Sequence, residues 1–259
     1  MKSEPIHILG AGLSGLSAAI ILSKNGYDVH VHEIRSDSGA RFDGDFQGLE
    51  NWTGSKDFFD EMREWGLDPD SFKSDAFSVV DLIHPDDEIT QPITDGVAFR
   101  VVERGTDEHC IDQGFKRMAI EAGATIHYGS KRDPEECQII AAGPKDSSAV
   151  AFGEIFHTDH PNHVSFQLND KLAPGAYSYL IVIDGIGLIC TCLWRKQKKS
   201  GRYLNETIAW YESHYELNRR PIKGSVGKAI FLYLTNITMT ADTTLARQGG
   251  FRTSCGVLG

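Results

Sequence analysis

The chain has 259 residues, of which 41% are hydrophobic and 24% charged, a composition typical of one large or two smaller globular domains. Thirty-six acidic and 26 basic residues give a formal net charge of −10, which disfavours nucleic acids and acidic membrane surfaces as partners. The apolar runs fall short of the ~20 residues that span a bilayer, and five cysteines without a secretory segment favour a reducing, cytoplasmic location.

Residues 6–33 predict a strand, a glycine-rich turn, a helix and a second strand. The apolar run over 6–9 favours a buried parallel strand, and the helix expected over 13–25 ends at an Asn-Gly pair. Between them lies Gly-x-Gly-x-x-Gly, which allows a tight turn, close approach of a pyrophosphate and close helix packing. The first N–H groups of such a helix face the phosphates. We therefore assign a dinucleotide site to the residues of this turn: Gly10, Gly12, Leu13, Ser14 and Gly15.

The second strand, expected over 27–32, is followed by Glu33, 23 positions after Gly10. A carboxylate at this place can accept hydrogen bonds from both hydroxyls of an adenosine ribose and disfavours a 2′-phosphate, so we expect FAD or NAD rather than NADP. A signal peptide is the alternative interpretation of residues 6–22, because they are largely apolar. The run begins too close to Met1 for a basic region, however, and three glycines interrupt it.

A polar segment with several glycines follows over 34–52. Arg41 is placed to pair with a pyrophosphate and Gly44 lets the backbone pass close to a ligand, although a polar surface loop would have the same composition. The run over 39–52 reads Gly-x-Arg-Phe-x-Gly-Asp-Phe-Gln-Gly-Leu-Glu-Asn-Trp. It resembles the geranylgeranyl reductase branch of the FAD-dependent oxidoreductases, in which this run follows the first dinucleotide-binding unit.

The resemblance extends over nearly all of residues 6–250 and is strongest over 6–53. In that family a helix and a strand ending in Ala-Thr-Gly occupy the places of 110–122 and 137–143. Met118 and Ala142 depart from the family pattern, so the fold implication holds but no polar contact is carried over to those two positions. We assign Gly143, and Arg104 after the strand expected over 97–103, to the cofactor site.

Further elements follow from periodicity and turn residues. Strands are expected over 77–84, 97–103, 125–128, 137–142, 152–157, 163–168, 176–183, 187–194 and near 229–234, and helices over 55–65, 111–122 and 203–215. Ser55 is the expected cap of the first of these helices, whose aromatic stripe we interpret as core.

Together these elements predict an α/β fold with a Rossmann-type dinucleotide-binding domain, a parallel sheet and an inserted antiparallel, β-rich substrate domain. We expect a discontinuous FAD- or NAD-binding domain over 1–75 and 100–150. The substrate domain is expected over 76–99 and 151–240.

The pair Tyr177 and Tyr179 matches an aromatic pair that lines the isoprenoid cavity beside the flavin in the resembled family. Alternating aromatic residues are also typical of any half-buried strand. The proline that usually follows the pair in the family is missing here. We assign both tyrosines to the substrate cavity.

Other candidate motifs do not predict a site. His157, His160 and His163 invite a metal, but a proline breaks helical spacing and a strand would put the first two on opposite faces, so we expect no metal site. Cys190 and Cys192 are expected to be buried thiols. No serine–histidine–acid pattern points to hydrolysis.

The carboxyl end departs from the family, which continues with a second flavin motif. Adding one base after the Phe251 codon in a back-translation of 250–259 restores Gly-Phe-Gln-Asp-Phe-Leu-Trp-Gly-Phe-Gly, the family's own continuation. We interpret 241–259 as an aberrant tail that follows a reading-frame slip and truncates the protein, with a genuine but different tail as the alternative. A chain without the second motif is expected to bind FAD weakly.

The resemblance implies an FAD-dependent oxidoreductase that transfers hydride from reduced flavin to a carbon–carbon double bond of an apolar, isoprenoid-like substrate. It also implies an electron donor such as NAD(P)H or ferredoxin, and allows peripheral membrane contact through the substrate. No catalytic residue can be named from the sequence. An FAD-dependent monooxygenase of the same fold and a truncated, non-catalytic flavoprotein remnant are the alternatives.

Overall fold

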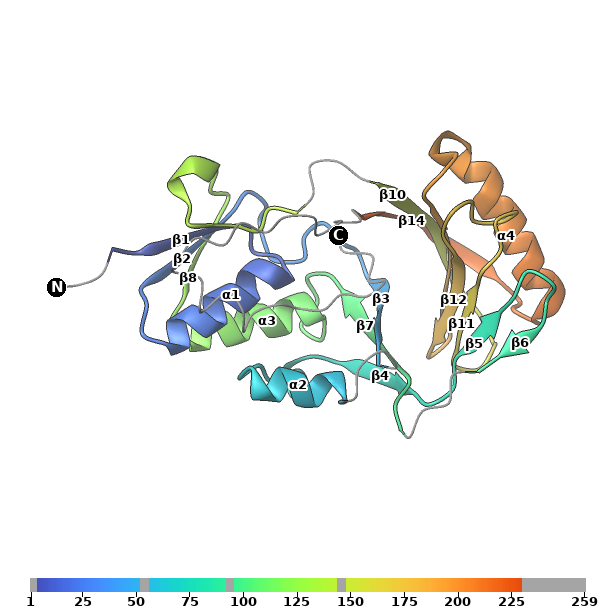
Figure 1. Ribbon diagram of the computed structural model, residues 1–259, viewed down its shortest axis with the longest axis horizontal. Coiled ribbons are helices and arrows are strands. Elements are labelled where there is room, and N and C mark those ends of the chain that lie inside the picture. Colours follow the sequence, from blue (N-terminus) through green and yellow to red (C-terminus); the bar gives the residue numbers. More distant parts are fainter. Residues whose placement is uncertain (1–3, 52–55, 92–95, 144–147, 230–259) are drawn as a thin grey trace.

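The computed structural model describes residues 4–51, 56–91, 96–143 and 148–229. The tail interpreted as aberrant and Ser55, the expected helix cap, lie outside these residues. Figure 1 shows a parallel sheet with helices at one end of the molecule and a large sheet covered by one helix at the other. A small sheet lies between them.

The parallel sheet has the order β8-β2-β1-β9, in which every neighbouring pair is parallel. Its strands are β1 (Ile6–Leu9), β2 (Val29–Glu33), β8 (Thr125–Tyr128) and β9 (Ile139–Ile140). The helices α1 (Leu13–Lys24) and α3 (Ile111–Glu121) pack on one face of it (Figure 1). The predicted Rossmann-type unit is therefore confirmed, including the return of the chain to this sheet at β9.

Alternation along the strands explains which face the helices cover. Ile8, Val29 and Val31 are fully buried against the helices, where they join Leu16 and Phe115 in one core. The intervening residues point to the opposite face of the sheet. This alternation therefore decides which side chains of the sheet face the helices and which lie on its other face.

The small antiparallel sheet has the order β3-β7-β4, with strands β3 (Asp45–Glu50), β7 (Phe99–Arg104) and β4 (Ser74–Phe77). The short helix α2 (Phe58–Glu64) precedes a single 3₁₀ turn over Pro69–Ser71. Asp57 caps α2 by accepting a hydrogen bond from the N–H of Phe59, at 2.8 Å. The cap therefore lies two residues beyond the one expected from the sequence.

The large sheet has the order β14-β10-β13-β12-β11-β5-β6. Its strands are β5 (Asp81–Ile83), β6 (Ile89–Thr90), β10 (Ala149–His157), β11 (His163–Gln167), β12 (Ser178–Ile183), β13 (Ile186–Leu193) and β14 (Arg220–Ala229). The predicted antiparallel pairing of 176–194 is confirmed. One pair, β5 with β11, is parallel, so the sheet is mixed.

One strand prediction was wrong in its bounds. The single strand expected over 77–84 is divided between β4 and β5, because the chain leaves the small sheet and enters the large one within that apolar run. The strand expected near 229–234 lies, apart from Ala229, outside the described residues, whereas the strand β14 over Arg220–Ala229, which pairs with β10, was not predicted. Its lysines, glycines and proline lack the apolar pattern that would have located it, since tertiary pairing overrides propensity here.

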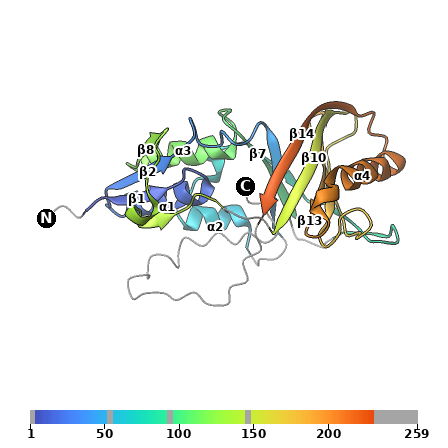
Figure 2. The same cartoon turned by 90° about the horizontal axis from the view of Figure 1, so that it is seen from above.

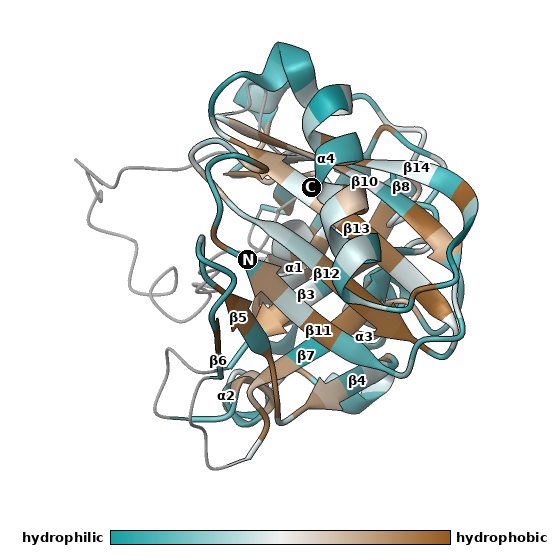
Figure 3. Cartoon of the chain, turned by 90° about the vertical axis from the view of Figure 1, so that its right-hand side faces the viewer, coloured by the Kyte–Doolittle hydropathy of each residue, from teal (hydrophilic) through white to brown (hydrophobic). Residues whose placement is uncertain are grey.

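The helix α4 (Ser200–His214) covers the outer face of the large sheet, where Ile208 and Tyr211 join a buried cluster. Much of its surface is teal or pale in Figure 3, whereas brown apolar segments run along the strands behind it. None of the helices in the described part of the chain is long and apolar enough to cross a bilayer.

Four histidines lie on the face of the parallel sheet opposite the helices: His7, His30, His32 and His127. The Nδ1 of His7 and the Nε2 of His32 are 3.1 Å apart, and Nδ1 of His30 and Nε2 of His127 are 2.9 Å apart. Burial, followed by the positive charges of Arg132 and the neighbouring rings, lowers the pKa of His32 from 6.5 to about 4.

This cluster predicts a loss of stability in acid. The unfolded chain protonates His32 near pH 6.5 but the folded chain only near pH 4, so the free energy of unfolding falls as pH drops through that window. We expect a loss of about 2–3 kcal/mol, measured by urea denaturation at pH 7 and pH 4.5. His32→Gln should flatten the difference between the two pH values, whereas His84→Gln, on the distant large sheet, should keep it. An unchanged pH profile in His32→Gln would contradict this account.

Candidate functional site

The glycine turn between β1 and α1 has the geometry that a dinucleotide requires. Gly10 has a φ of +102°, and a Cβ there would lie 2.4 Å from the carbonyl oxygen of Ala141. A Cβ at Gly15 would lie 1.9 Å from the carbonyl oxygen of Gly10. A Cβ at Gly12, in contrast, would meet nothing within 4 Å. The first and third glycines therefore pack the unit together, and the second leaves open space for a ligand beside the backbone.

The amino end of α1 presents backbone donors to this space. Its N-cap is Gly12, which has no side chain to accept a hydrogen bond, and no acidic residue lies in the first turn. Leu13 is half-buried and Ser14 is exposed. A helix that starts without an acidic or capping side chain keeps both its donors and the positive end of its dipole available for a phosphate.

Glu33 lies at the carboxyl end of β2, beside the turn. Its Oε2 accepts a hydrogen bond from the N–H of Ala11 at 3.0 Å, and its Oε1 accepts one from the N–H of Arg35 at 2.9 Å. These bonds fix the carboxylate next to Gly12, and each oxygen keeps a second acceptor position. The arrangement fits a carboxylate that receives ribose hydroxyls.

The strand β9 brings Gly143 to the same edge of the sheet. The N–H of Ala141 donates to the carbonyl oxygen of Leu9 at 2.7 Å, which aligns the ends of β9 and β1. Gly143 is exposed, with a φ of +76°. The structure thus brings Gly10 to Gly15, Glu33 and Gly143 together where the parallel strands end, the usual ligand edge of such sheets.

Arginines gather in the segment that follows Glu33. Arg41 is exposed as a residue, but its guanidinium is partly buried, and this burial lowers its pKa together with the positive charges of Arg35 and Arg104. Two guanidinium groups of this segment, those of Arg35 and Arg41, lie close enough to repel each other and fit a site for an anionic group such as a pyrophosphate. Gly44 has a φ of +76°, and its N–H donates to the carbonyl oxygen of Arg104 at 3.1 Å.

Arg104 is the most constrained of the predicted site residues. Its Nε and Nη2 each donate to the Asp112 carboxylate at 2.8 Å, and both side chains are buried. Its Nη1 donates to Oε1 of Gln47, and its guanidinium carbon lies 4.1 Å from the ring centre of Phe42. Arg104 therefore joins α3 to the 42–47 segment, through Nε–H and one N–H of each terminal nitrogen. Sequence reasoning did not predict this pairing with Asp112.

A cavity of about 260 Å³ lies between the small sheet and the large sheet. Its wall is mostly aromatic and aliphatic and comprises Phe42, Phe46, Leu82, Phe99, Ala151, Phe166, Leu168, Tyr177, Tyr179, Ile181 and Val226. The polar side chains in the wall are Asp45, Gln47, Glu50, Arg104, Cys190 and Ser225. Tyr177 and Tyr179 both line this cavity, and Arg104 lies in the same wall.

The strand β14, which was not predicted from the sequence, closes this cavity. Ser225 Oγ donates a hydrogen bond to Oδ1 of Asp45, and Lys223 Nζ lies 2.7 Å from Oδ2 of Asp43. These contacts join the large sheet to the start of β3, as Figure 2 shows for the edge where β14 approaches the small sheet. Polar residues on β14 thus hold the two halves of the wall together.

The tyrosine pair is embedded in aromatic packing. The ring of Phe166 lies 5.8 Å from that of Tyr177 and 6.0 Å from that of Tyr179. Burial, with Cys190 and Cys192 nearby, raises the pKa of Tyr179 well above its usual range. The phenol therefore stays protonated at neutral pH, and its hydroxyl can donate or accept a hydrogen bond but carries no negative charge.

The histidine motif over 157–163 lies apart from this site, on the large sheet. The rings of His160 and His163 are 5.4 Å apart and both contact the ring of Tyr215. The Nδ1 of His160 lies 2.9 Å from the carbonyl oxygen of Pro161. His157 is exposed at the end of β10. His160 and His163 thus take part in aromatic packing with Tyr215 on the large sheet.

The first part of the chain matches known proteins directly. Residues 8–45 match the family model described as an NAD(P)-binding Rossmann-like domain. Hydroxysqualene dehydroxylase of Rhodopseudomonas palustris is 51% identical over 39 residues, which cover 15% of this chain and 9% of that protein. The protein of the same name from Sinorhizobium fredii is 48% identical over 48 residues, which cover 18% and 12%. The matched segments thus span about a tenth of these curated relatives.

Solved structures match most of the chain. A geranylgeranyl bacteriochlorophyll reductase-like protein from Thermoplasma acidophilum has a TM-score of 0.63 at 17% identity, over 86% of this chain and 65% of that one. For 2-methyl-3-hydroxypyridine-5-carboxylic acid oxygenase the TM-score is 0.56 at 17% identity, over 88% and 72%. Aklavinone-11 hydroxylase, solved with FAD and aklavinone, has a TM-score of 0.55 at 14% identity, over 86% and 53%.

The chain thus shares its fold with a reductase-like protein, an oxygenase and a hydroxylase that was solved with FAD. The resemblance that the sequence indicated is confirmed at the level of the fold, because a geranylgeranyl reductase-like protein is among the similar structures. The Rossmann-type unit is matched by sequence as well.

The Arg104–Asp112 pair generates a stability prediction. Asp112→Asn leaves a buried guanidinium without its counter-charge and should lower the free energy of unfolding by about 3–5 kcal/mol, measured by urea denaturation. The double variant Arg104→Met/Asp112→Leu should recover much of that loss, because no uncompensated charge remains. Asp184→Asn, which removes an exposed partner of Lys73, serves as the control and should change stability far less. Equal effects of Asp112→Asn and Asp184→Asn would contradict the assignment.

Proposed function

We propose that this chain is an FAD-dependent oxidoreductase of the geranylgeranyl reductase type, which reduces carbon–carbon double bonds of an isoprenoid-like substrate. The observation that carries the proposal is the apolar cavity, whose wall combines residues of the 42–50 run with Tyr177 and Tyr179. A wall of aromatic and aliphatic side chains with few polar groups suits a branched hydrocarbon chain.

The residues at the sheet edge fit the adenine-dinucleotide part of FAD. The open space beside Gly12, the donors of Leu13 and Ser14 and the carboxylate of Glu33 would hold the pyrophosphate and the ribose. Arg41, Gly44 and Gly143 extend the same edge toward the cavity. When bound, FAD would supply the hydride in its reduced form.

The protein's own contribution is orientation and exclusion of water. Arg104 holds the 42–47 segment against α3, and β14 closes the other side, so the cavity wall is fixed before substrate enters. Tyr179, which lines the cavity, keeps its proton at neutral pH. The same proposal includes the discontinuous FAD-binding and substrate domains and an electron donor such as NAD(P)H or ferredoxin. It also includes a cytoplasmic location and peripheral membrane contact through the substrate.

The second candidate is a flavin monooxygenase, which two of the similar structures favour because they are an oxygenase and a hydroxylase. Purified protein with added FAD, a reductant and a polyprenyl lipid separates the two. Without oxygen, a reductase yields a product heavier by two hydrogens for each double bond reduced, as mass spectrometry reports. A product that gains oxygen, and only in air, would establish the monooxygenase. A chain that binds no flavin would establish the non-catalytic remnant and contradict the proposal.

Cofactor binding generates a direct prediction at Glu33. Removing a carboxylate that accepts two ribose hydroxyls should weaken FAD binding by about 1–3 kcal/mol in Glu33→Ala, measured by flavin fluorescence titration. Glu121→Ala, at the exposed end of α3, is the matched control and should bind FAD as the parent chain does. Unchanged affinity in Glu33→Ala would remove the ribose assignment.

A further inference from the structure

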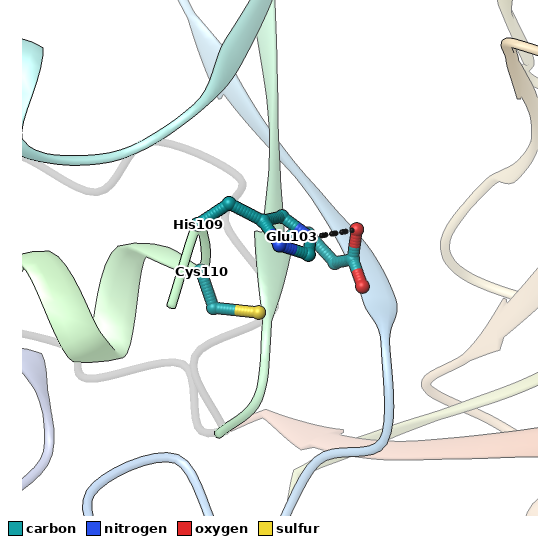
Figure 4. A group of neighbouring side chains, drawn as sticks. All are labelled: Glu103, His109 and Cys110. Atoms are coloured by element: carbon teal, nitrogen blue, oxygen red, sulfur yellow. Dashed lines mark hydrogen bonds and ion pairs between the residues drawn. The ribbon is translucent and has the colours of Figure 1, made fainter. Parts of the chain in front are cut away.

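Three side chains of metal-binding type gather on one side of the small sheet: Glu103, His109 and Cys110 (Figure 4). Within the described residues, this is the one group of three such side chains whose ligand atoms all lie within 4.8 Å of one another. The Nε2 of His109 is 2.9 Å from Oε2 of Glu103. A hydrogen bond explains why His109 lies close to Glu103. It does not explain why the Cys110 thiol lies close to both of these side chains.

The backbone holds these residues in place from two elements. Glu103 is the penultimate residue of β7, and its side chain points to the opposite side from that of Arg104. The chain then turns back, and Cys110 is the N-cap of α3. The carbonyl oxygen of His109 accepts a hydrogen bond from the N–H of Lys73 at 2.9 Å, and the N–H of Cys110 donates to the carbonyl oxygen of Asp107 at 2.9 Å. The ligands therefore do not depend on a freely moving loop.

We propose that Glu103, His109 and Cys110 bind a divalent transition-metal ion of the zinc class. Zinc accepts one carboxylate oxygen, one imidazole nitrogen and one thiolate sulfur, whereas magnesium and calcium require oxygen ligands throughout. The carboxylate and thiolate together carry the two negative charges that a divalent ion neutralises. On binding, the thiol proton is released to water. Because His109 is exposed, a water molecule completes the coordination.

The ion would brace the same two segments that the buried arginine joins. Glu103 precedes Arg104 on β7, and Cys110 lies two residues before Asp112 at the start of α3. The Glu103 carboxylate also borders the 42–47 segment, since a Cβ at Gly44 would lie 3.1 Å from its Oε1. The metal thus ties β7 to α3 on the side opposite the cavity. This role is independent of whether the protein binds flavin.

Cobalt(II) added to the full-length, reduced chain tests the site, since a sulfur-to-cobalt charge-transfer absorption appears only where a thiolate binds the metal. We expect one equivalent of Co²⁺ to give that absorption, Zn²⁺ to displace it, and Zn²⁺ to raise the melting temperature. Cys110→Ser should abolish the absorption. His109→Ala, an exposed position whose loss leaves the fold intact, should weaken Co²⁺ binding by at least about tenfold.

Two variants serve as matched controls. Cys137→Ser removes a half-buried thiol and His84→Ala removes a half-buried imidazole, each on a different part of the fold. Both should bind Co²⁺ as the parent chain does. Absence of the charge-transfer absorption in the parent chain, or its persistence at full affinity in Cys110→Ser or His109→Ala, would overturn the proposal.

Discussion

The buried ion pair between Arg104 and Asp112 is the constraint on which the site depends. It lies at the end of β7, where the small sheet meets α3, and the same guanidinium reaches Gln47 and packs on Phe42. An ion pair taken out of water stabilises a protein only with full hydrogen bonding and good geometry, which both oxygens of Asp112 supply here. One side chain thereby fixes where the segment after the dinucleotide turn lies relative to the cavity.

The fold and the geometry of the glycine turn were largely predictable from sequence, because both depend on local patterns. The glycine spacing, the apolar alternation of β1 and β2 and the acid at Glu33 act within one short stretch of chain. The contacts that shape the cavity could not be predicted. Arg104 meets Gln47 across 57 positions, and Ser225 meets Asp45 across 180, through polar residues that carry no periodic signal.

Contacts between residues far apart in the sequence also explain why the metal-ligand group and β14 could not be predicted. Glu103 and the His109-Cys110 pair look like unrelated surface residues until β7 and the start of α3 are placed together. The strand β14 is rich in lysine and glycine, yet it pairs along the length of β10 and closes the cavity. Tertiary neighbours decide the conformation of such a segment more strongly than its own propensity.

The central claim is that the dinucleotide turn and the apolar cavity form one site, with flavin and hydrocarbon in contact. The most direct measurement is the absorbance spectrum of protein-bound FAD during titration with a polyprenyl lipid. A saturable change in the flavin bands is expected, because apolar groups that replace water beside the ring system alter its surroundings. Binding of the lipid, seen independently by calorimetry, with an unchanged flavin spectrum would contradict the claim.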